Sequence, residues 1–132
     1  MPKIFTSEKQ KIGKIGENIA CKFLMKHNFL ILDRNYTKKW GEIDIVAKKQ
    51  DKLYFIEVKS ISSGVSGETQ NGYRPEENMH QWKMKRMSRT IQTYLLSKKI
   101  PDEKEWQVDL LVVYLDIKNK KTKIKKIEDL VL

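Results

Sequence analysis

The stretch GEIDIVAKKQDKLYFIEVKS, residues 41–60, contains two mostly apolar runs separated by the polar pair Gln50 and Asp51. Runs of this length around a short polar break are typical of two antiparallel strands joined by a tight turn. Four charged residues nevertheless interrupt the runs: Glu42, Asp44, Glu57 and Lys59. Because desolvating a charged group is unfavourable, a strand that must be buried has little use for them. These four residues therefore require a functional explanation.

The length of the turn decides where these charges lie. A two-residue turn pairs Lys49 with Lys52. In that register two further pairs face each other, Asp44 with Glu57 and Glu42 with Lys59. Alternation along each strand places one set of side chains on a common face: Asp44, Val46, Phe55, Glu57 and Lys59. The opposite face takes Ile43, Ile45, Ile56 and Val58. A three-residue turn would separate Asp44 from the face of Glu57.

Two carboxylates at directly opposed positions create an electrostatic problem. Their Cβ atoms are about 4.5–5.5 Å apart, and ionised carboxylates at that separation repel each other, more so when desolvated. A shared divalent cation removes the repulsion, and carboxylate oxygens suit Mg²⁺ or Mn²⁺. Lys59, on the same face, would orient or activate a bound water or stabilise charge on a phosphate oxygen. The alternative is a partly solvated face on which Lys59 pairs with Glu57 or Glu42.

The residues before the hairpin predict a helix and a strand. Apolar residues recur at helical spacing over residues 9–27, with Ser7 as the N-cap and Gln10 at the capping-box position. Glu17 lies at the edge of the apolar face of this helix. The single cysteine, Cys21, lies in the same pattern and is expected to be buried. Residues 28–36 then form a strand.

The residues after the hairpin complete the sheet. A polar segment leads to Pro75, which suits the first turn of a second helix that extends to about residue 98. Residues 106–116 are almost continuously apolar, as in a strand buried on both faces, and the last residues alternate as an edge strand. The element order α-β-β-β-α-β-β predicts an α/β fold, a mixed four- to five-stranded sheet flanked by helices. Residues 1–132 are expected to form a single domain.

The charge balance indicates the class of partner. The 132 residues include 27 Lys and Arg against 17 Asp and Glu, a net charge of +10. This excess favours a polyanion, nucleic acid first, with an anionic membrane surface or an ordinary lysine-rich surface as the alternatives. Nucleotide-binding glycine motifs do not occur. Without an apolar leader or a run long enough to span a membrane, the protein is expected in the cytoplasm.

Basic residues gather on the second predicted helix and just before it. We expect these side chains to contact nucleic-acid phosphates: Arg74, Lys83, Lys85, Arg86 and Arg89. A solvated helix face is the alternative. His27 suits the C-terminal end of the first helix, whereas His80 opens the second helix near the polar segment.

The order of motifs resembles the YraN-type family of small bacterial proteins. The first helix has the form G-x-x-G-E-x-x-A, at Gly13, Gly16, Glu17 and Ala20. Four motifs follow in order: Arg34-Asn35, Gly41-Glu42-Ile43-Asp44, Phe55 to Lys59, and Tyr94-Leu95. The last motif is Asp109-Leu110-Leu111. The resemblance covers residues 12–116, and the D…E-x-K core is similar to that of the PD-(D/E)XK restriction-endonuclease-like superfamily.

This resemblance implies a restriction-endonuclease-like fold with a site similar to that of Holliday-junction resolvases. Asp44 and Glu57 would be metal ligands, the backbone carbonyl of Val58 would add a ligand, and Glu17 would be an accessory ligand or a supporting acid. Lys59 would act on the attacking water. The reaction would be hydrolysis of a DNA phosphodiester with Mg²⁺ or Mn²⁺.

The chain departs from the resemblance at two kinds of position. Ser60, Ile61 and Ser62 stand where many relatives carry Arg, and Gln107 stands where Arg often precedes the last motif. We therefore expect altered substrate contacts around an intact metal site.

Three functions fit the sequence. The first is a metal-dependent endonuclease acting on branched or single-stranded DNA. The second is a non-catalytic nucleic-acid-binding protein that keeps the nuclease fold, and the third is an RNA-processing nuclease. A homodimer would supply the two sites that cutting both strands of a symmetric junction requires.

Overall fold

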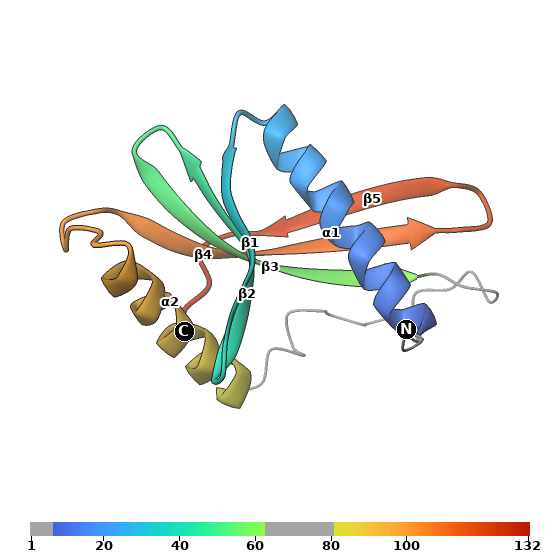
Figure 1. Ribbon diagram of the computed structural model, residues 1–132. Coiled ribbons are helices and arrows are strands. Elements are labelled where there is room, and N and C mark those ends of the chain that lie inside the picture. Colours follow the sequence, from blue (N-terminus) through green and yellow to red (C-terminus); the bar gives the residue numbers. More distant parts are fainter. Residues whose placement is uncertain (1–6, 63–80) are drawn as a thin grey trace, which may run out of the picture.

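The computed structural model describes residues 7–62 and 81–132, with the backbone alone for 81–83, and it has the predicted order of elements (Figure 1). The two helices are α1 (Glu8–Lys26) and α2 (Gln81–Ser97). The five strands are β1 (Leu30–Lys38), β2 (Gly41–Lys49), β3 (Lys52–Ser62), β4 (Trp106–Asp116) and β5 (Lys121–Ile127). The prediction of a mixed α/β sheet is therefore confirmed, with five strands. The part of the second predicted helix before residue 81 lies outside the described residues.

Helix α1 begins at the predicted cap. The Ser7 hydroxyl accepts from the Gln10 backbone N–H at 3.1 Å, and the Gln10 side chain accepts from the Ser7 N–H at 2.9 Å. This capping box satisfies two donors that the helix cannot pair internally. The helix ends at His27, whose Nδ1 lies 2.8 Å from the Phe23 carbonyl oxygen. Cys21 is buried, as predicted.

The strands form one sheet in the order β1-β2-β3-β4-β5. The β3–β4 pair is parallel and the other three pairs are antiparallel. Strand β4 therefore lies inside the sheet, and residues 108–113 are all buried, which confirms the prediction of a strand covered on both faces. Strand β1 is an edge, and its pairing with β2 shifts register between Ile31 and Asp33. Strand β5 is the other edge.

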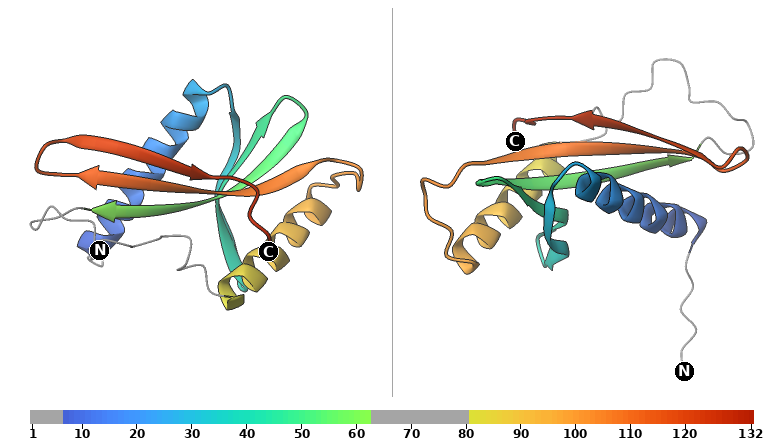
Figure 2. Two further views of the ribbon diagram at one scale, coloured as in Figure 1. Left: turned by 180° about the vertical axis from the view of Figure 1, so that it is seen from behind. Right: turned by 90° about the horizontal axis from the view of Figure 1, so that it is seen from above.

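Two separate hydrophobic cores lie on the two faces of the sheet. The α1-side core contains Ala20, Cys21, Leu24, Phe29, Ile45, Ala47, Ile56, Leu111, Val113 and Leu115. The α2-side core contains Ile43, Val46, Leu53, Phe55, Met87, Ile91, Tyr94 and Val108. Figures 1 and 2 show the β1–β2 hairpin between the two helices, so this hairpin separates the cores.

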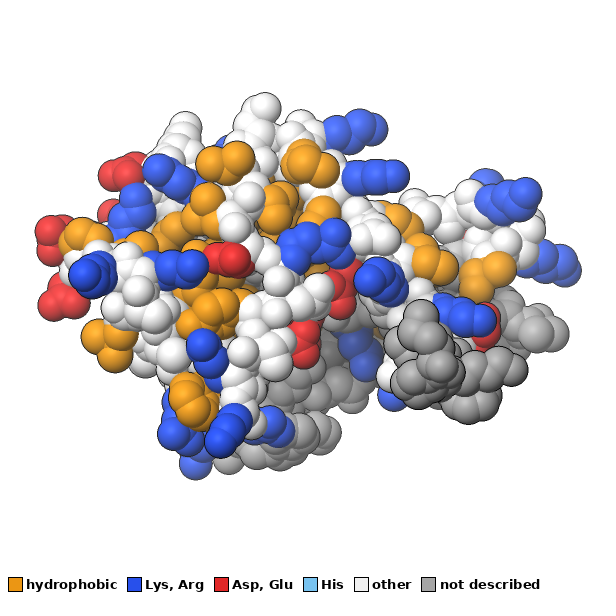
Figure 3. All heavy atoms as spheres, viewed as in Figure 1, with side chains coloured by type: hydrophobic (Ala, Val, Ile, Leu, Met, Phe, Trp, Pro, Cys, Tyr) orange, Lys and Arg blue, Asp and Glu red, His pale blue; other side chains and the backbone are white. Residues whose placement is uncertain are grey.

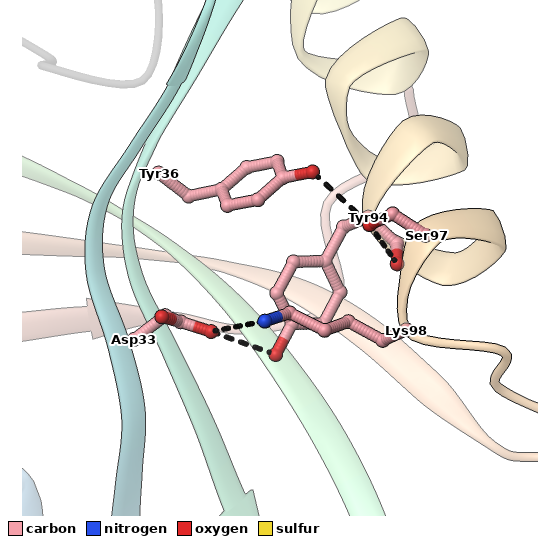
Figure 4. A network of polar contacts seen from close by, with 5 residues as sticks. All are labelled: Asp33, Tyr36, Tyr94, Ser97 and Lys98. Carbon is pink, nitrogen blue, oxygen red and sulfur yellow. Dashed lines mark hydrogen bonds and ion pairs between the residues drawn. The ribbon is translucent and has the colours of Figure 1, made fainter.

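Polar contacts fix the C-terminal end of α2 on β1 (Figure 4). The Tyr94 hydroxyl donates to Asp33 at 3.1 Å, and the Lys98 ammonium lies 3.9 Å from the same carboxylate. The hydroxyl groups of Tyr36 and Ser97 are 3.3 Å apart. Burial, followed by the bond to Asp33, raises the pKa of Tyr94 to about 12. The helix is thus held on the hairpin by hydrogen bonds as well as by the α2-side core.

Among the described helices, neither has the length and apolar composition needed to cross a lipid bilayer.

Candidate active site

The β2–β3 hairpin has the predicted turn and register. Lys49 pairs with Lys52, Val46 pairs with Phe55, and the regular pairing continues to Ile45 and Ile56. The two further pairs that this register predicted, Asp44 with Glu57 and Glu42 with Lys59, are not part of the ladder, because the strands separate after Ile45 and Ile56. Instead, the Val58 backbone N–H donates to Asp44 Oδ2 at 2.8 Å. The Asp44 carboxylate therefore links β2 to β3 by a side-chain hydrogen bond where the backbone hydrogen bonds between the two strands end.

The expected alternation of side chains fails next to Asp44. Ile43 was expected to share a face with Ile45, but Ile43 belongs to the α2-side core and Ile45 to the α1-side core. A regular strand puts residues two apart on the same face, so β2 departs from regular alternation between Ile43 and Ile45 and the expectation is wrong. Asn35 lies across from Asp44, between the pairs that Arg34 and Tyr36 form with β2.

Asn35 gives a physical reason for this change of face. Its φ of 53° lies in the left-handed region, which Asn tolerates better than most residues but a regular strand does not contain. The side-chain amide, oriented so that its nitrogen faces the acids, donates to Glu17 and Glu42 at 3.0 Å each. Asn35 thus joins α1 to β2 beside Asp44.

The same contacts bring Glu17 to the site. Besides the Asn35 amide, Glu17 lies 3.8 Å from the Arg34 guanidinium, which also donates to Asn18 at 2.9 Å. The Glu17 side chain is 22% exposed. The position of Glu17 on α1 therefore allows it to belong to this site. Its role as an accessory ligand or supporting acid stays a prediction.

The electrostatics of the site are dominated by Asp44. Burial and then the nearby Glu57 carboxylate raise the pKa of Asp44 to about 8, with smaller contributions from Glu17 and Glu42. The Val58 N–H acts in the opposite direction because it favours the ionised form. Glu57 itself is only 9% exposed. Desolvation and the neighbouring carboxylate thus favour the protonated form of Asp44 near neutral pH.

Lys59 lies two residues beyond Glu57 on β3. Its side chain is half-buried, and among the ion pairs of the described residues none joins it to Glu57 or Glu42. The next residue, Ser60, lies against Gly16 so closely that a Cβ on Gly16 would be 1.7 Å from the Ser60 hydroxyl oxygen. This contact holds α1, and with it Glu17, against the strand that carries Glu57 and Lys59.

The donor set suits a hard cation. Asp44 and Glu57 offer carboxylate oxygens from adjacent strands, and their mutual repulsion is the condition that a shared Mg²⁺ or Mn²⁺ relieves. Within residues 7–62 and 81–132, no group of three or more His, Cys, Asp and Glu side chains is close enough to hold a metal ion. The ligand role of the Val58 carbonyl stays a prediction.

The predicted phosphate-binding residues differ in their surroundings. Arg74 lies outside the described residues, and the side chain of Lys83 is likewise not described. Lys85 is exposed. By contrast, Arg86 donates to the Trp40 carbonyl at 2.8 Å, and the Arg89 guanidinium lies 4.4 Å from the centre of the Trp40 ring. Both arginines therefore contact the β1–β2 turn, and their binding of phosphates stays a prediction.

Gln107 and Asp109 form a hydrogen-bonded pair that the sequence did not predict. Gln107 Nε2 donates to Asp109 Oδ1 at 2.7 Å, and the same oxygen accepts from the Asp129 N–H at 3.0 Å. Asp109 is fully buried. The departure at Gln107 thus affects a contact that anchors the C-terminal residues on β4. The one sequence signal for this pair is its separation by two residues, which puts both side chains on the same face of β4.

Comparison with known proteins gives a consistent family match. The model of "Uncharacterised protein family UPF0102" matches residues 16–113. A UPF0102 protein of Campylobacter jejuni subsp. jejuni (strain 81-176) is 42% identical over 105 residues, 80% of this chain and 85% of that protein. Another, from Alkaliphilus oremlandii, is 38% identical over 120 residues, 91% and 97% of the two chains. A third, from Campylobacter concisus, is 42% identical over 102 residues, 76% and 81%.

Proposed function

The chain belongs to the UPF0102 family, whose matched region includes Glu17, Asp44, Glu57 and Lys59, and we propose that these residues form the active site of a metal-dependent endonuclease. The substrate would be DNA in branched or single-stranded form. The reaction would be hydrolysis of a phosphodiester bond. The observation that carries this proposal is the buried carboxylate pair, in which Glu57 helps to raise the pKa of Asp44 to about 8.

The acids have a defined task in this proposal. Asp44 and Glu57 would hold Mg²⁺ or Mn²⁺, with the Val58 carbonyl as a further ligand. When bound, the cation supplies charge neutralisation at the phosphate and a lower pKa for a coordinated water. The Val58 N–H, 2.8 Å from Asp44 Oδ2, orients one oxygen of that carboxylate and leaves Oδ1 for the cation.

Lys59 would act on the substrate. Alternation places it on the face of Glu57, two residues farther along β3. Its ammonium group would stabilise the negative charge that develops on the phosphate oxygens, or orient the attacking water. The absence of an ion pair to Glu57 or Glu42 among the described residues supports this role, because an ammonium already paired would be less available.

Glu17, Glu42 and Asn35 would position the acids. The Asn35 amide donates to both glutamates at 3.0 Å and so holds their carboxylates close to each other. Since both glutamates contribute to the raised pKa of Asp44, their placement also affects how strongly the site attracts a cation.

A cleavage assay tests the proposal. We expect the purified protein to nick branched or single-stranded DNA with Mn²⁺ or Mg²⁺, and to lose this activity with EDTA. Glu57→Gln keeps the size of the side chain and removes its charge, so it should abolish cleavage. Lys59→Met should lower cleavage while retaining Mn²⁺ binding. No cleavage by the wild-type protein across single-stranded, duplex and branched DNA and RNA would contradict the enzyme function.

One observation favours a second function, a nucleic-acid-binding protein without catalysis. The chain has a net charge of +10, which favours binding of nucleic acid whether or not the protein cleaves it. Such a protein would bind nucleic acid equally well with EDTA and with Glu57→Gln. Gel-shift measurements with and without EDTA distinguish the two functions.

A further inference from the structure

Three lysines of β5 lie on the sheet face that carries Glu57 and Lys59. The register across the sheet places Lys59 beside Val112, and Val112 beside Lys125. Side chains at laterally paired positions point to the same face of a sheet. Lys125 therefore shares a face with Lys59, two strands away. Alternation along β5 adds Lys123 and Lys121 to the same face.

The packing of β5 gives independent support for this orientation. Ile124, between two of these lysines, packs against the α1-side core. Lys126, on the same side as Ile124, lies 5.0 Å from the centre of the Phe29 ring and 3.2 Å from Glu128. Lys126, which points toward α1, thus contacts other residues of the protein. The lysine row, defined as Lys121, Lys123 and Lys125, points away from α1.

The lysine row is available to a partner. All three side chains are exposed. Within the described part of the chain, Lys123 and Lys125 form no salt bridge or hydrogen bond, and Lys121 has Asp116 as its charged neighbour across the β4–β5 pair. Seen from behind in Figure 2, the β4–β5 hairpin lies in front of α1, so the row belongs to the face turned away from the viewer in Figure 3.

The dimensions of the row suit a nucleic-acid backbone. Residues of one face are about 7 Å apart along a strand, so Lys121 and Lys125 are separated by about 14 Å. This is the axial length of about four nucleotides in one strand of a duplex. Two strand spacings, about 10 Å, then separate Lys125 from Lys59.

We propose that the lysine row binds the sugar–phosphate backbone of a nucleic acid and leads one strand toward Glu57 and Lys59. The second part of this proposal rests on the proposed function, because a nucleic-acid strand is led toward Glu57 and Lys59 only if these residues form an active site. An anionic membrane also attracts lysines, but it would not require them to share a face with Glu57 and Lys59. The observations therefore favour nucleic acid.

The experiment compares two double variants that remove the same charge. Lys123→Gln with Lys125→Gln changes the row, whereas Lys22→Gln with Lys26→Gln changes exposed lysines of α1, on the other face of the sheet. Binding to labelled single-stranded and branched DNA is measured by fluorescence anisotropy at several salt concentrations. EDTA is present throughout, so binding is recorded whether or not the protein cleaves. Thermal unfolding checks that both variants remain folded.

We expect the row variant to bind roughly tenfold or more weakly, and the slope of log K against log salt to fall by about 1.4–1.8, because two phosphate contacts are lost. The α1 variant should keep the wild-type slope. Equal losses in the two variants, no loss in the row variant, or no DNA binding by the wild type would overturn the proposal. Row-dependent binding to phosphatidylserine vesicles without binding to DNA would overturn it as well. Row-dependent binding without any cleavage would instead contradict the enzyme function alone.

Discussion

Asp44 Oδ2 accepts a hydrogen bond from the Val58 backbone N–H at 2.8 Å, just beyond Ile45 and Ile56, the last regular pair of β2 and β3. A side chain thus replaces the backbone ladder where the strands separate. Asp44 is half-buried at this point, and Glu57 is among the charges that raise its pKa. Because the N–H favours the ionised carboxylate, this contact opposes the burial and the Glu57 charge that raise the pKa of Asp44.

The first prediction concerns pH. Because the pKa of Asp44 is about 8 when folded and about 3.9 when unfolded, the folded state retains a proton that the unfolded state has released between these values. The contribution of Asp44 to stability is complete below pH 4 and is lost as the pH rises to about 8. Without metal, its contribution should fall by up to about 1.4 kcal/mol for each pH unit.

Urea unfolding at pH 5, 6, 7 and 8 in EDTA measures this effect. Other groups also titrate, so the quantity to compare is the difference between the wild type and Asp44→Asn, which has no proton to lose. This difference should change steadily across the range in favour of the variant. Parallel curves for the two proteins would show that Asp44 is ionised throughout.

The second prediction concerns divalent cations. Because Mn²⁺ would bind the folded state at Asp44 and Glu57, it should raise the unfolding free energy by about 2.7 kcal/mol at a concentration 100 times its dissociation constant. Glu57→Gln should remove most of this stabilisation. Calorimetric unfolding with increasing Mn²⁺ measures it, with Glu128→Gln as an exposed control outside the site. Equal stabilisation of the wild type and Glu57→Gln would place the cation elsewhere.

The third prediction concerns Asn35. Its φ of 53° is strained for a residue with a Cβ, so Asn35→Gly should be more stable than Asn35→Ala by about 1 kcal/mol. Both variants lack the amide that donates to Glu17 and Glu42, and both should therefore bind Mn²⁺ differently from the wild type. Urea unfolding and Mn²⁺ titration separate these effects. Equal stability of the two variants would argue against left-handed strain.

The fourth prediction concerns two glycines of α1. An added Cβ on Gly16 would collide with Ser60, whereas one on Gly13 would have no atom within 4 Å. Gly16→Ala should lower the unfolding free energy by roughly 1–3 kcal/mol. Gly13→Ala should raise it by roughly 0.5–1 kcal/mol, because Ala favours the helix.

Urea denaturation of both variants gives these values, and the matched pair controls for helix propensity. Gly16→Ala combined with Ser60→Gly should recover part of the loss, since the colliding atoms are gone. A stable Gly16→Ala protein would mean that α1 can move away from β3.

The fifth prediction separates two basic residues of α2. Arg89 contacts the Trp40 ring, so Arg89→Gln should cost about 0.5–1 kcal/mol of stability. Lys85 is exposed, and Lys85→Gln should leave stability within about 0.5 kcal/mol. If Lys85 contacts a phosphate, as predicted, its variant lowers the salt slope of DNA binding by about one. Thermal unfolding and anisotropy measure the two quantities, and an unchanged slope would remove Lys85 from the interface.

Much of the fold could be predicted because its signals are local. The polar pair Gln50 and Asp51 set the hairpin turn, and its length set the register. Ser7 and Gln10 marked the start of α1 in the same way. Each of these features depends on residues within a few positions of one another.

The change of face at Asp44 could not be predicted from alternation. It depends on a left-handed Asn35, and that conformation is supported by contacts with α1 and β2, elements distant in sequence. The alignment of Lys125 with Lys59 was hidden for a similar reason, because it requires the neighbours of β4 to be known. Pairings between distant strands are a property of the whole sheet.

The register shift between Ile31 and Asp33 has a consequence for the behaviour of the protein in concentrated solution. An outer strand with an irregular backbone is a poor template for a strand from another molecule, because its free N–H and C=O groups are out of step. The other outer strand, β5, repels a second copy through Lys121, Lys123 and Lys125. Edge-to-edge pairing of two copies is thus disfavoured by geometry at one edge of the sheet and by charge at the other.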